Sequence, residues 1–475
     1  MTDDAAALTK LSLLEQMGGV RAGDVSFAEV VNSHLQEIDQ YDDTLRAFIS
    51  VNRDATNAAA AIDSRHDRLD LPLLGAVVSI KDIFDEESMP NTAGRHPDLV
   101  SVAERDSTVV ARLKQAGAVI IGGTHLHEFA AGMTTDNPHY GATKNPWSID
   151  RIPGGSSGGS AASVAAGMCA VSIGTDTGGS VRIPAALSGV VGMRPTYGRL
   201  SRFGLVLLSW SLDQPGVLAR SVADCELVYR HIAGRDPSDP STSRQPVLAA
   251  QFGPGGIDPR QISVGIPTEF YWERLSDDVR RAFDHLIEQL REIGCSIESV
   301  DLPNLPNAAE AQATIGCAET ASTYPDLVER THLLGDDVVE RLTSGRHISA
   351  VDYLNAQRAR RALMVDLGNA LSSCDVLVCP ATATTAIPLG ADGALTDGQW
   401  RGLVEIYAHF TGPFSLTGSP VVVVPIGFDS DQLPIGAQVV GRAFADHRAL
   451  EIGALIEGVL GISGRQPEGL SNGAK

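Results

Sequence analysis

The sequence predicts an α/β fold in which helices pack against a large sheet. Short apolar runs with strand character alternate with helical segments between residues 72 and 235, and the same pattern returns between residues 375 and 461. The length of 475 residues could hold two or three average domains, but it also suits one large α/β unit. No internal repeat interrupts this pattern.

The first part of the chain is expected to be helical. Residues 8–66 have helical periodicity, and Ser26 and Glu29 have the spacing of a capping box that begins a helix through about Ile38. We therefore predict an N-terminal helical region at residues 1–70, followed by the main domain at residues 71–475.

An apolar run follows from Leu71 to Ile80, broken by Pro72, Gly75 and Ser79. This pattern is typical of a buried strand, and its last side chain would be that of Lys81.

The second half of the main domain begins after a polar stretch. Residues 236–241 read DPSDPS, which predicts a linker or an excursion from the fold. Beyond it, strands are expected at residues 262–267 and 295–302, on either side of a helix that begins near Ser276. Helices are then predicted from about residue 308 to residue 372.

Composition limits the possible partners and the compartment. A formal net charge of −21 argues against nonspecific binding to nucleic acid or to anionic lipid. The N-terminus lacks the pattern of a signal peptide, and the longest apolar stretch, residues 421–426, is too short to span a bilayer. Six cysteines are scattered without zinc or C-x-x-C spacing, so we expect reduced thiols and a cytoplasmic protein.

The most informative segment is residues 151–199, where Ser156 and Ser180 each follow a Gly-Gly pair. Glycine allows backbone N–H groups to approach a reacting atom closely. A flexible linker would not need the alanines and valine of residues 161–166 or the apolar run of residues 169–173. The pattern predicts a Gly-rich turn, a small-residue helix, a short strand and a second Gly-rich turn.

This segment allows three catalytic interpretations. A phosphate-binding loop requires a Gly-Lys pair, which is absent. A serine-hydrolase elbow formally fits Ser156 and Ser157, with His409 and His447 as the available bases, but it leaves residues 178–180 without a role. A third interpretation uses both Gly-rich turns together with the upstream GAVVSIKD segment, which ends in Lys81-Asp82.

These residues closely resemble the amidase signature family. Lys81 in SIKD, Ser156 in GGSSGG and Ser180 in GTDTGGSVRIPA match the family's Lys, cis-Ser and Ser positions, with separations of 75 and 24 residues. The resemblance extends through RDSTVVARLKQAGAVIIGGTHLHEF, NPHYGATKNPW, VVGMRPTYGRLSRFGL, SLDQPG and FTGPFSLTGSPVVVVPIG, and so covers most of the chain. It implies the amidase signature fold, an α/β/α sandwich around a large mixed β-sheet, with a variable helical cap at about residues 308–372.

The resemblance also implies the catalytic roles. Ser180 would be the nucleophile, Ser156, preceded by a cis peptide bond, would relay its proton, and Lys81 would accept that proton and return it to the leaving amine. A serine hydroxyl needs such a base, and a lysine can be one only when it is neutral, which requires a pKa far below about 10.4.

The second Gly-rich turn would supply the remaining parts of the site. The backbone N–H groups of Thr177, Gly178, Gly179 and Ser180 would form the oxyanion hole. Asp176 and Arg182 flank the turn with opposite charges, and we expect them to pair and hold it. Ser157 is expected to add a hydrogen bond to Lys81 or to the turn.

A metal site was considered at His125 and His127. Strand alternation would place both rings on one face, as a metal requires. No further ligands with usable spacing could be assigned, and Thr124-His125 and Glu128-Phe129 fit the family's own pattern. We therefore expect neither a metal nor a cofactor.

The expected function is a stand-alone amidase that cleaves a small amide. Met133, Leu208 and Trp210 are candidates for its acyl pocket and would suit an apolar or aryl group; an ester, carbamate, hydrazide or urea could react by the same acyl transfer. We expect a small-molecule amide as partner, no nucleic acid, no membrane, and a homodimer.

The alternative is the glutamine-hydrolysing A subunit of a tRNA-dependent amidotransferase. Those subunits share TKNPW-like and PTYGRLSR-like segments with this chain, but they typically have Gln where this chain has Ile183. The FTGPFSLTGSP run looks more like stand-alone amidases, whose pocket the chain's own cap, roughly residues 308–410, would complete.

Overall fold

The computed structural model describes residues 8–252, 256–268 and 270–467. Its main sheet contains β1 (Phe48–Val51), β2 (Val77–Lys81), β5 (Val119–Thr124), β8 (Val171–Asp176), β9 (Val191–Arg194), β10 (Gln214–Ala219), β11 (Ser263–Pro267), β12 (Ser296–Val300), β13 (Val376–Pro380), β16 (Val421–Phe428) and β17 (Pro434–Val440). Three small sheets pair β3 (Pro90–Asn91) with β4 (Ser101–Val102), β6 (Asp136–Asn137) with β7 (Gly141–Ala142), and β14 (Gly393–Thr396) with β15 (Gln399–Gly402).

The helices alternate with these strands along the chain. They are α2 (Leu13–Ala22), α3 (Phe27–Leu45), α4 (Ala55–Asp63), α5 (Thr108–Gln115), α6 (Gly158–Ala165), α7 (Arg182–Ser188), α8 (Val222–Ile232), α9 (Asp277–Glu292), α10 (Ala308–Thr323), α11 (Asp336–His347), α12 (Ala350–Ser373), α13 (His409–Thr417) and α14 (Asp446–Leu460).

The main sheet is mixed, with the strand order β1-β5-β2-β8-β10-β9-β16-β17-β13-β11-β12. Strand β2 runs parallel to β5 and β8, and β11 runs parallel to β12 and β13. The other neighbouring strands are antiparallel. Because β2, β5 and β8 are parallel, they end at one edge of the sheet, and the second Gly-rich turn starts there, directly after β8.

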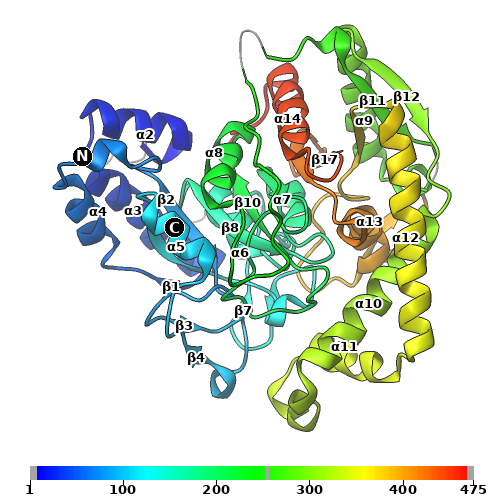
Figure 1. Ribbon diagram of the computed structural model, residues 1–475, viewed down its shortest axis with the longest axis horizontal. Coiled ribbons are helices and arrows are strands. Elements are labelled where there is room, and N and C mark those ends of the chain that lie inside the picture. Colours follow the sequence, from blue (N-terminus) through cyan, green and yellow to red (C-terminus); the bar gives the residue numbers. More distant parts are fainter. Residues whose placement is uncertain (1–7, 253–255, 269, 468–475) are drawn as a thin grey trace.

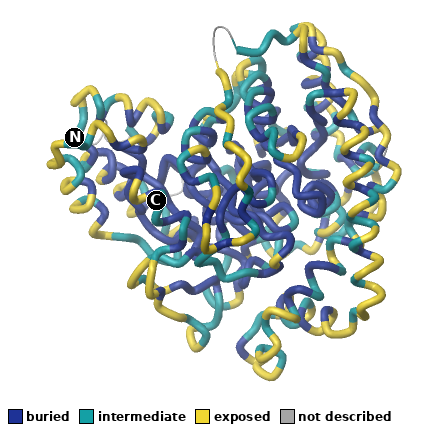
Figure 2. The backbone as a smooth tube through the Cα atoms, viewed as in Figure 1, coloured by how far each residue is buried: buried dark blue, intermediate teal, exposed yellow. Residues whose placement is uncertain are grey.

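Helices cover both faces of the sheet, as Figure 1 shows. Successive residues of a strand point to opposite faces. Val78 of β2 and Val217 of β10 belong to one buried cluster, with side chains of α5, α8, α9 and α14. Val77 and Leu218, their neighbours in sequence, belong to a second cluster, with side chains of α3 and α6. The expected α/β/α sandwich is confirmed, and Figure 2 shows its buried centre and exposed outer helices.

The cap helices α10, α11 and α12 lie at the end of the molecule opposite to α2, α3 and α4 (Figure 1). Helix α10 packs against α11, α12 and α13, and α12 also contacts β11. The helices expected at about residues 308–372 are therefore present, and α10 connects this cap to the centre of the fold.

Several local predictions are confirmed because they depend on short-range chemistry. The Ser26 hydroxyl caps α3, and the Glu29 carboxylate bonds back to the Ser26 backbone. The small-residue helix α6 and the short strand β8 lie between the two Gly-rich turns. The two strands expected after residue 260 form as β11 and β12, and Ser276 caps α9 between them.

Two boundary predictions are wrong, and of the two interpretations of residues 236–241 the linker is wrong. The N-terminal region expected at residues 1–70 is not wholly helical, because β1 pairs with β5 and extends the main sheet. Helix α3 continues to Leu45, past Ile38. The stretch at residues 236–241 is an ordered turn rather than a linker: the Asp236 side chain is 5 % exposed and accepts hydrogen bonds from Thr108 and Ser201.

All six cysteines are free thiols. Within the described ranges, no helix is both long and apolar enough to cross a bilayer.

Candidate active site

Lys81 is the last residue of β2, and its side chain is fully buried. Its Nζ atom donates hydrogen bonds to Ser156 Oγ at 2.7 Å and to Thr175 Oγ1 at 2.8 Å. The strand thus places the amine at the sheet edge where the second Gly-rich turn begins, in contact with Ser156 of the first. Thr175 precedes the second turn, and nothing in the sequence marked it as a partner of the lysine.

Burial lowers the pKa of Lys81 to about 7, although the carboxylates of Asp213 and Asp176 act to raise it. A large share of this amine is therefore neutral near pH 7, whereas a lysine in water stays charged up to about pH 10. A neutral amine bonded to a serine hydroxyl can act as a general base.

Ser156 lies in the first Gly-rich turn, directly before α6. The Gly155–Ser156 peptide bond is cis. The turn is closely packed: a Cβ atom added to Gly155 would lie 2.8 Å from the backbone of Met133 and Thr134. The Ser156 side chain is fully buried, and its carbonyl accepts a hydrogen bond from the His127 N–H.

Ser180 lies at the end of the second turn and is 6 % exposed. Its carbonyl accepts a hydrogen bond from the Ser157 N–H at 3.2 Å, which joins the two turns. Among the described residues, none bonds the Ser180 hydroxyl, and none accepts from the backbone N–H groups of residues 177–180. The turn therefore offers free donors beside a free hydroxyl.

Gly179 shows why this turn must be bare backbone. Its φ of +139° lies in a region that other residues rarely adopt. A Cβ atom at this position would lie 2.1 Å from Thr411 Oγ1, so no side chain fits. Thr411, in α13, donates instead to the Gly178 carbonyl at 2.6 Å and holds the turn from the far side.

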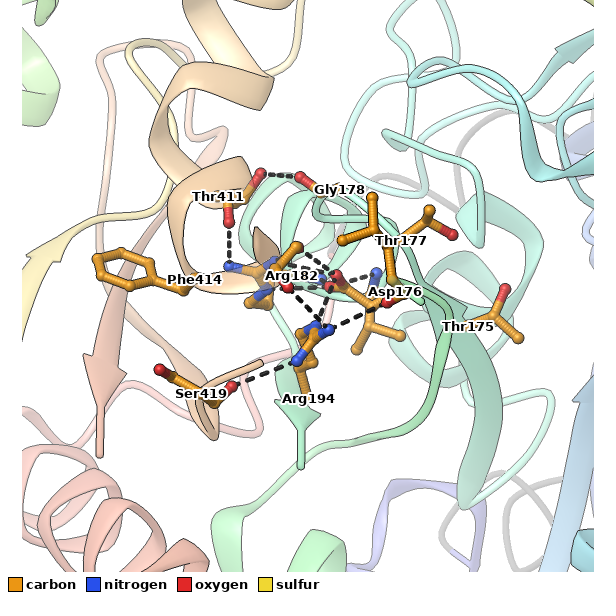
Figure 3. A network of polar contacts seen from close by, with 12 residues as sticks. Thr175, Asp176, Thr177, Gly178, Arg182, Arg194, Thr411, Phe414 and Ser419 are labelled. Carbon is orange, nitrogen blue, oxygen red and sulfur yellow. Dashed lines mark hydrogen bonds and ion pairs between the residues drawn. The ribbon is translucent and has the colours of Figure 1, made fainter. Parts of the chain in front are cut away.

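Asp176 is fully buried between two guanidinium groups, as Figure 3 shows. Arg182 Nη2 lies 2.9 Å from Asp176 Oδ1, and Arg194 Nε lies 3.2 Å from the same atom. Burial acts to raise the pKa of Asp176, but the two arginines outweigh it and hold this pKa well below the usual range. The expected Asp176–Arg182 contact is present, and Arg194 joins it.

Arg182 extends this network to α13 and β17. Its guanidinium donates to the Thr411 carbonyl, to Gln438 Oε1 and to Ser415 Oγ. The second Gly-rich turn is thus tied to elements more than 200 residues further along the chain.

We predict that Asp176→Asn strongly destabilises the fold, because it leaves two buried arginines without their carboxylate. Losing one partner of a buried ion pair costs about 3–5 kcal/mol of unfolding free energy. Denaturant titration monitored by circular dichroism measures this cost. Asp39→Asn, in an exposed pair with Arg53, is the matched control and should not change stability measurably. Equal stability of the Asp176 and Asp39 variants would contradict the structural role of Asp176.

Ser157 bonds Thr175 rather than Lys81. Its hydroxyl donates to the Thr175 carbonyl at 3.2 Å and accepts from the Thr175 N–H at 3.3 Å. Ser157 was expected to bond either Lys81 or the turn, and the structure shows the second, because Thr175 leads directly into the turn. Thr175 also bonds Lys81.

A pocket opens over Ser180, and we call it the active-site pocket. Met133 and Leu208 line it as expected, but Trp210 does not, because its side chain is 52 % exposed. Its polar side chains are those of Thr177, Ser180, Gln312 and Arg341. The other lining residues are glycine, alanine or larger apolar residues, and none of those that the structure describes is acidic.

The cap supplies two of these polar groups. Gln312, in α10, lies directly over the second Gly-rich turn, since a Cβ atom added to Gly178 would be 2.9 Å from its Nε2 atom. Arg341, in α11, has a buried Nη1 atom without a hydrogen-bond partner among the described residues. Asp337, one turn earlier in α11, bonds His127 at 2.8 Å and also interacts electrostatically with Arg341. The sequence alone did not predict Gln312 or Arg341 in the pocket, because only the folded chain brings α10 and α11 over the second Gly-rich turn.

The histidines considered earlier lie in other surroundings. His125 and His127 follow β5 instead of belonging to it, so strand alternation does not align their rings. The ring of His125 meets that of Tyr140 edge-on. No group of three or more His, Cys, Asp or Glu side chains suited to a metal ion occurs in residues 8–252, 256–268 and 270–467. His409 and His447 do not line the active-site pocket, which removes the bases that the elbow interpretation required.

Comparison with known proteins points to one family. A family model described as Amidase matches residues 29–450. The A subunit of glutamyl-tRNA(Gln) amidotransferase from Roseiflexus sp. (strain RS-1) is 37% identical, covering 97% of this chain and 99% of that relative.

Two solved structures extend the likeness to the fold. One is a chain from "an unexpected vestigial protein complex" that bears on the origins of "an s-triazine catabolic enzyme", with a TM-score of 0.88, 33% identity, and coverage of 96% of this chain and 100% of that one. The other is described as an amidase, with a TM-score of 0.86, 32% identity, and coverage of 95% and 100%.

Proposed function

Since the chain belongs to the amidase family, we propose that it is a serine-dependent amide hydrolase that works through an acyl-enzyme on Ser180. The observation that carries this proposal is the 2.7 Å contact between Lys81 and Ser156, with the free hydroxyl of Ser180 lining the adjacent pocket. The amine is buried and partly neutral, as a general base requires.

The reaction begins with proton transfer out of Ser180. Ser156 accepts the Ser180 proton as it passes its own proton to Lys81, and Ser180 Oγ attacks the amide carbonyl. As the C–N bond breaks, Lys81 returns the proton through Ser156 to the departing amine. A water molecule then loses a proton along the same path and attacks the acyl group, which frees the acid and restores Ser180.

The second Gly-rich turn stabilises the negative charge that develops on the carbonyl oxygen. We propose that the N–H groups of residues 177–180 form the oxyanion hole, a role supported by their lack of partners in the described structure. Loss of one such donor typically costs about 2.7–4 kcal/mol of transition-state stabilisation. The Asp176–Arg182 pair and Thr411 hold the turn in place from behind.

The pocket favours an amide that carries a carboxylate. Arg341 brings a guanidinium into a pocket that is otherwise mostly apolar, and its buried Nη1 atom lacks a partner. A buried donor without a partner is costly unless a ligand completes it, and a carboxylate fits a guanidinium best. We propose a small amide whose body meets Met133 and Leu208 and whose carboxylate meets Arg341.

The second candidate function is glutamine hydrolysis as the A subunit of a tRNA-dependent amidotransferase. It is supported by the names of the relatives, among them the Roseiflexus protein. The charge of the pocket supports the first candidate instead. Glutamine carries an α-ammonium as well as a carboxylate, and no acidic side chain among the described lining residues would pair with that ammonium.

We predict that Arg341→Met raises the KM of a carboxylate-bearing amide by about tenfold to a hundredfold, because a hydrogen bond to a charged group is worth about 1.5–3 kcal/mol. A neutral amide of the same length should be affected little. Steady-state kinetics on the purified chain, expected as a homodimer, measures both. Arg346→Met, at an exposed position of the same helix, is the control.

The same assays separate the two functions. Glutamine should be hydrolysed at least about tenfold less efficiently than the best small amide, a difference of about 1.4 kcal/mol in transition-state binding. If glutamine is the best substrate and its hydrolysis requires a second protein and tRNA, the second candidate is correct.

A further inference from the structure

Asp213 is a buried carboxylate beside the active-site pocket to which the catalytic steps assign no role. It lies in the loop between β9 and β10 and is 4 % exposed. Its Oδ1 atom accepts a hydrogen bond from Thr177 Oγ1 at 2.6 Å. Its Oδ2 atom accepts from the N–H groups of Leu208 at 2.7 Å and Ser209 at 3.0 Å.

These three bonds join two walls of the pocket. Thr177 begins the turn whose N–H groups face the reacting carbonyl, and Leu208 is an apolar residue of the pocket lining. One carboxylate therefore fixes the distance between the oxyanion turn and the surface on which the substrate lies. A displacement of about 1 Å in such a geometry can reduce the rate by about a hundredfold.

The cap holds the same loop from its outer side. Thr320 Oγ1, in α10, donates to the Leu208 carbonyl at 3.0 Å. The Glu319 carboxylate, only 2 % exposed, accepts from the Ser211 N–H at 3.0 Å and from the Ser209 hydroxyl. The loop is thus fastened on one side to the catalytic turn and on the other to α10.

We propose that Asp213 is a positioning residue, which fixes the second Gly-rich turn and the Leu208 side of the pocket relative to each other. Because α10 bonds the same loop, the position of the cap then affects the rate of amide cleavage. The proposal rests on the amide hydrolase function described above. Asp213 itself does not touch the substrate, because it acts through Thr177 and Leu208.

The charge of Asp213 has a second consequence. Burial raises the pKa of this carboxyl, while its three donors and Arg202 act in the opposite direction. All three hydrogen-bonding partners donate, so the arrangement suits the carboxylate. Its negative charge, together with that of Asp176, favours the protonated form of Lys81. Removing the charge but keeping the shape should therefore lower the pKa of Lys81 further.

Two substitutions at one position separate geometry from charge. Asp213→Ala removes all three bonds and should reduce kcat by about tenfold to a hundredfold, with a smaller change in KM. Asp213→Asn keeps a side-chain oxygen that can accept from the N–H groups of Leu208 and Ser209, and it places the side-chain NH2 group beside Thr177. It should restore most of kcat, and the acid limb of its pH–rate profile should move to lower pH. Asp236→Asn, at a buried carboxylate bonded to hydroxyls outside the pocket, is the control and should change neither quantity.

The outcome decides between positioning and plain structural support. Wild-type kcat in Asp213→Ala, or a pH profile of Asp213→Asn identical to that of the wild type, would overturn the proposal. If Asp213→Ala does not fold, Thr177→Val replaces it: loss of that one hydroxyl should still lower kcat about tenfold, and an unchanged kcat would overturn the proposal. Failure of the hydrolase function itself is distinct, since the wild type would then lack Ser180-dependent hydrolysis.

Discussion

Ser180→Ala is expected to abolish amide hydrolysis, with kcat below about a thousandth of the wild-type value. The reaction has no other acyl acceptor, because Ser156 is fully buried against Lys81 and Ser180 is the serine that lines the active-site pocket. The fold should be unaffected, since the Ser180 hydroxyl has no hydrogen-bond partner in the described structure. Steady-state kinetics and a thermal melt on the same preparation measure both effects.

Ser163→Ala is a suitable control for this substitution. Ser163 lies in α6 and is fully buried, but it does not line the pocket. The control should keep its activity. Substantial turnover by Ser180→Ala, combined with labelling of another residue by a serine reagent, would contradict the assigned nucleophile.

Lys81→Met should remove most of kcat, because no other described residue donates to Ser156 Oγ or could take its proton. In the wild type, kcat/KM should rise with pH through about 7 and then level off, since the neutral amine is the active base. Below pH 7 the rate should fall about tenfold per unit, as the fraction of neutral amine falls. A pH–rate profile from pH 5 to 9 measures this.

The fold should tolerate this change. The folded-state pKa of Lys81 lies below the value of about 10.4 for a free lysine, so the native state binds fewer protons than the unfolded state between pH 7 and 10. The contribution of Lys81 to stability therefore rises with pH over that window and is lowest below pH 7. Methionine removes the unfavourable charge. Wild-type activity in Lys81→Met, or a profile with no limb near pH 7, would contradict the role of the lysine as base.

The parts of the fold that were predicted correctly depend on neighbours in sequence. The Ser26 cap needs only Glu29, and a buried strand ending at Lys81 follows from one apolar run. The glycine pattern of residues 151–199 predicted both turns, since bare backbone is the feature that the chemistry requires there.

The parts that were missed depend on contacts that only the folded chain makes. Arg194, Thr411 and Ser415 join Asp176 and Arg182 across 18 to 239 residues, and no local pattern marks them. Trp210 was expected in the pocket from its apolar type, but residue type alone does not fix the direction of a side chain. Strand β1 has only four residues and lies in a mostly helical region. It is recognised by its pairing with β5 and not by a pattern in its own sequence.

Formation of an acyl group on Ser180 can be detected by mass spectrometry of the chain quenched during turnover of a slowly deacylated aryl ester. We expect one added acyl group on the peptide that spans both Gly-rich turns, with fragment ions that assign it to Ser180 and not to Ser156. No adduct should form on Ser180→Ala. An acyl group on Lys81, on a cysteine or on Ser156 in the wild-type chain would show that Ser180 is not the nucleophile.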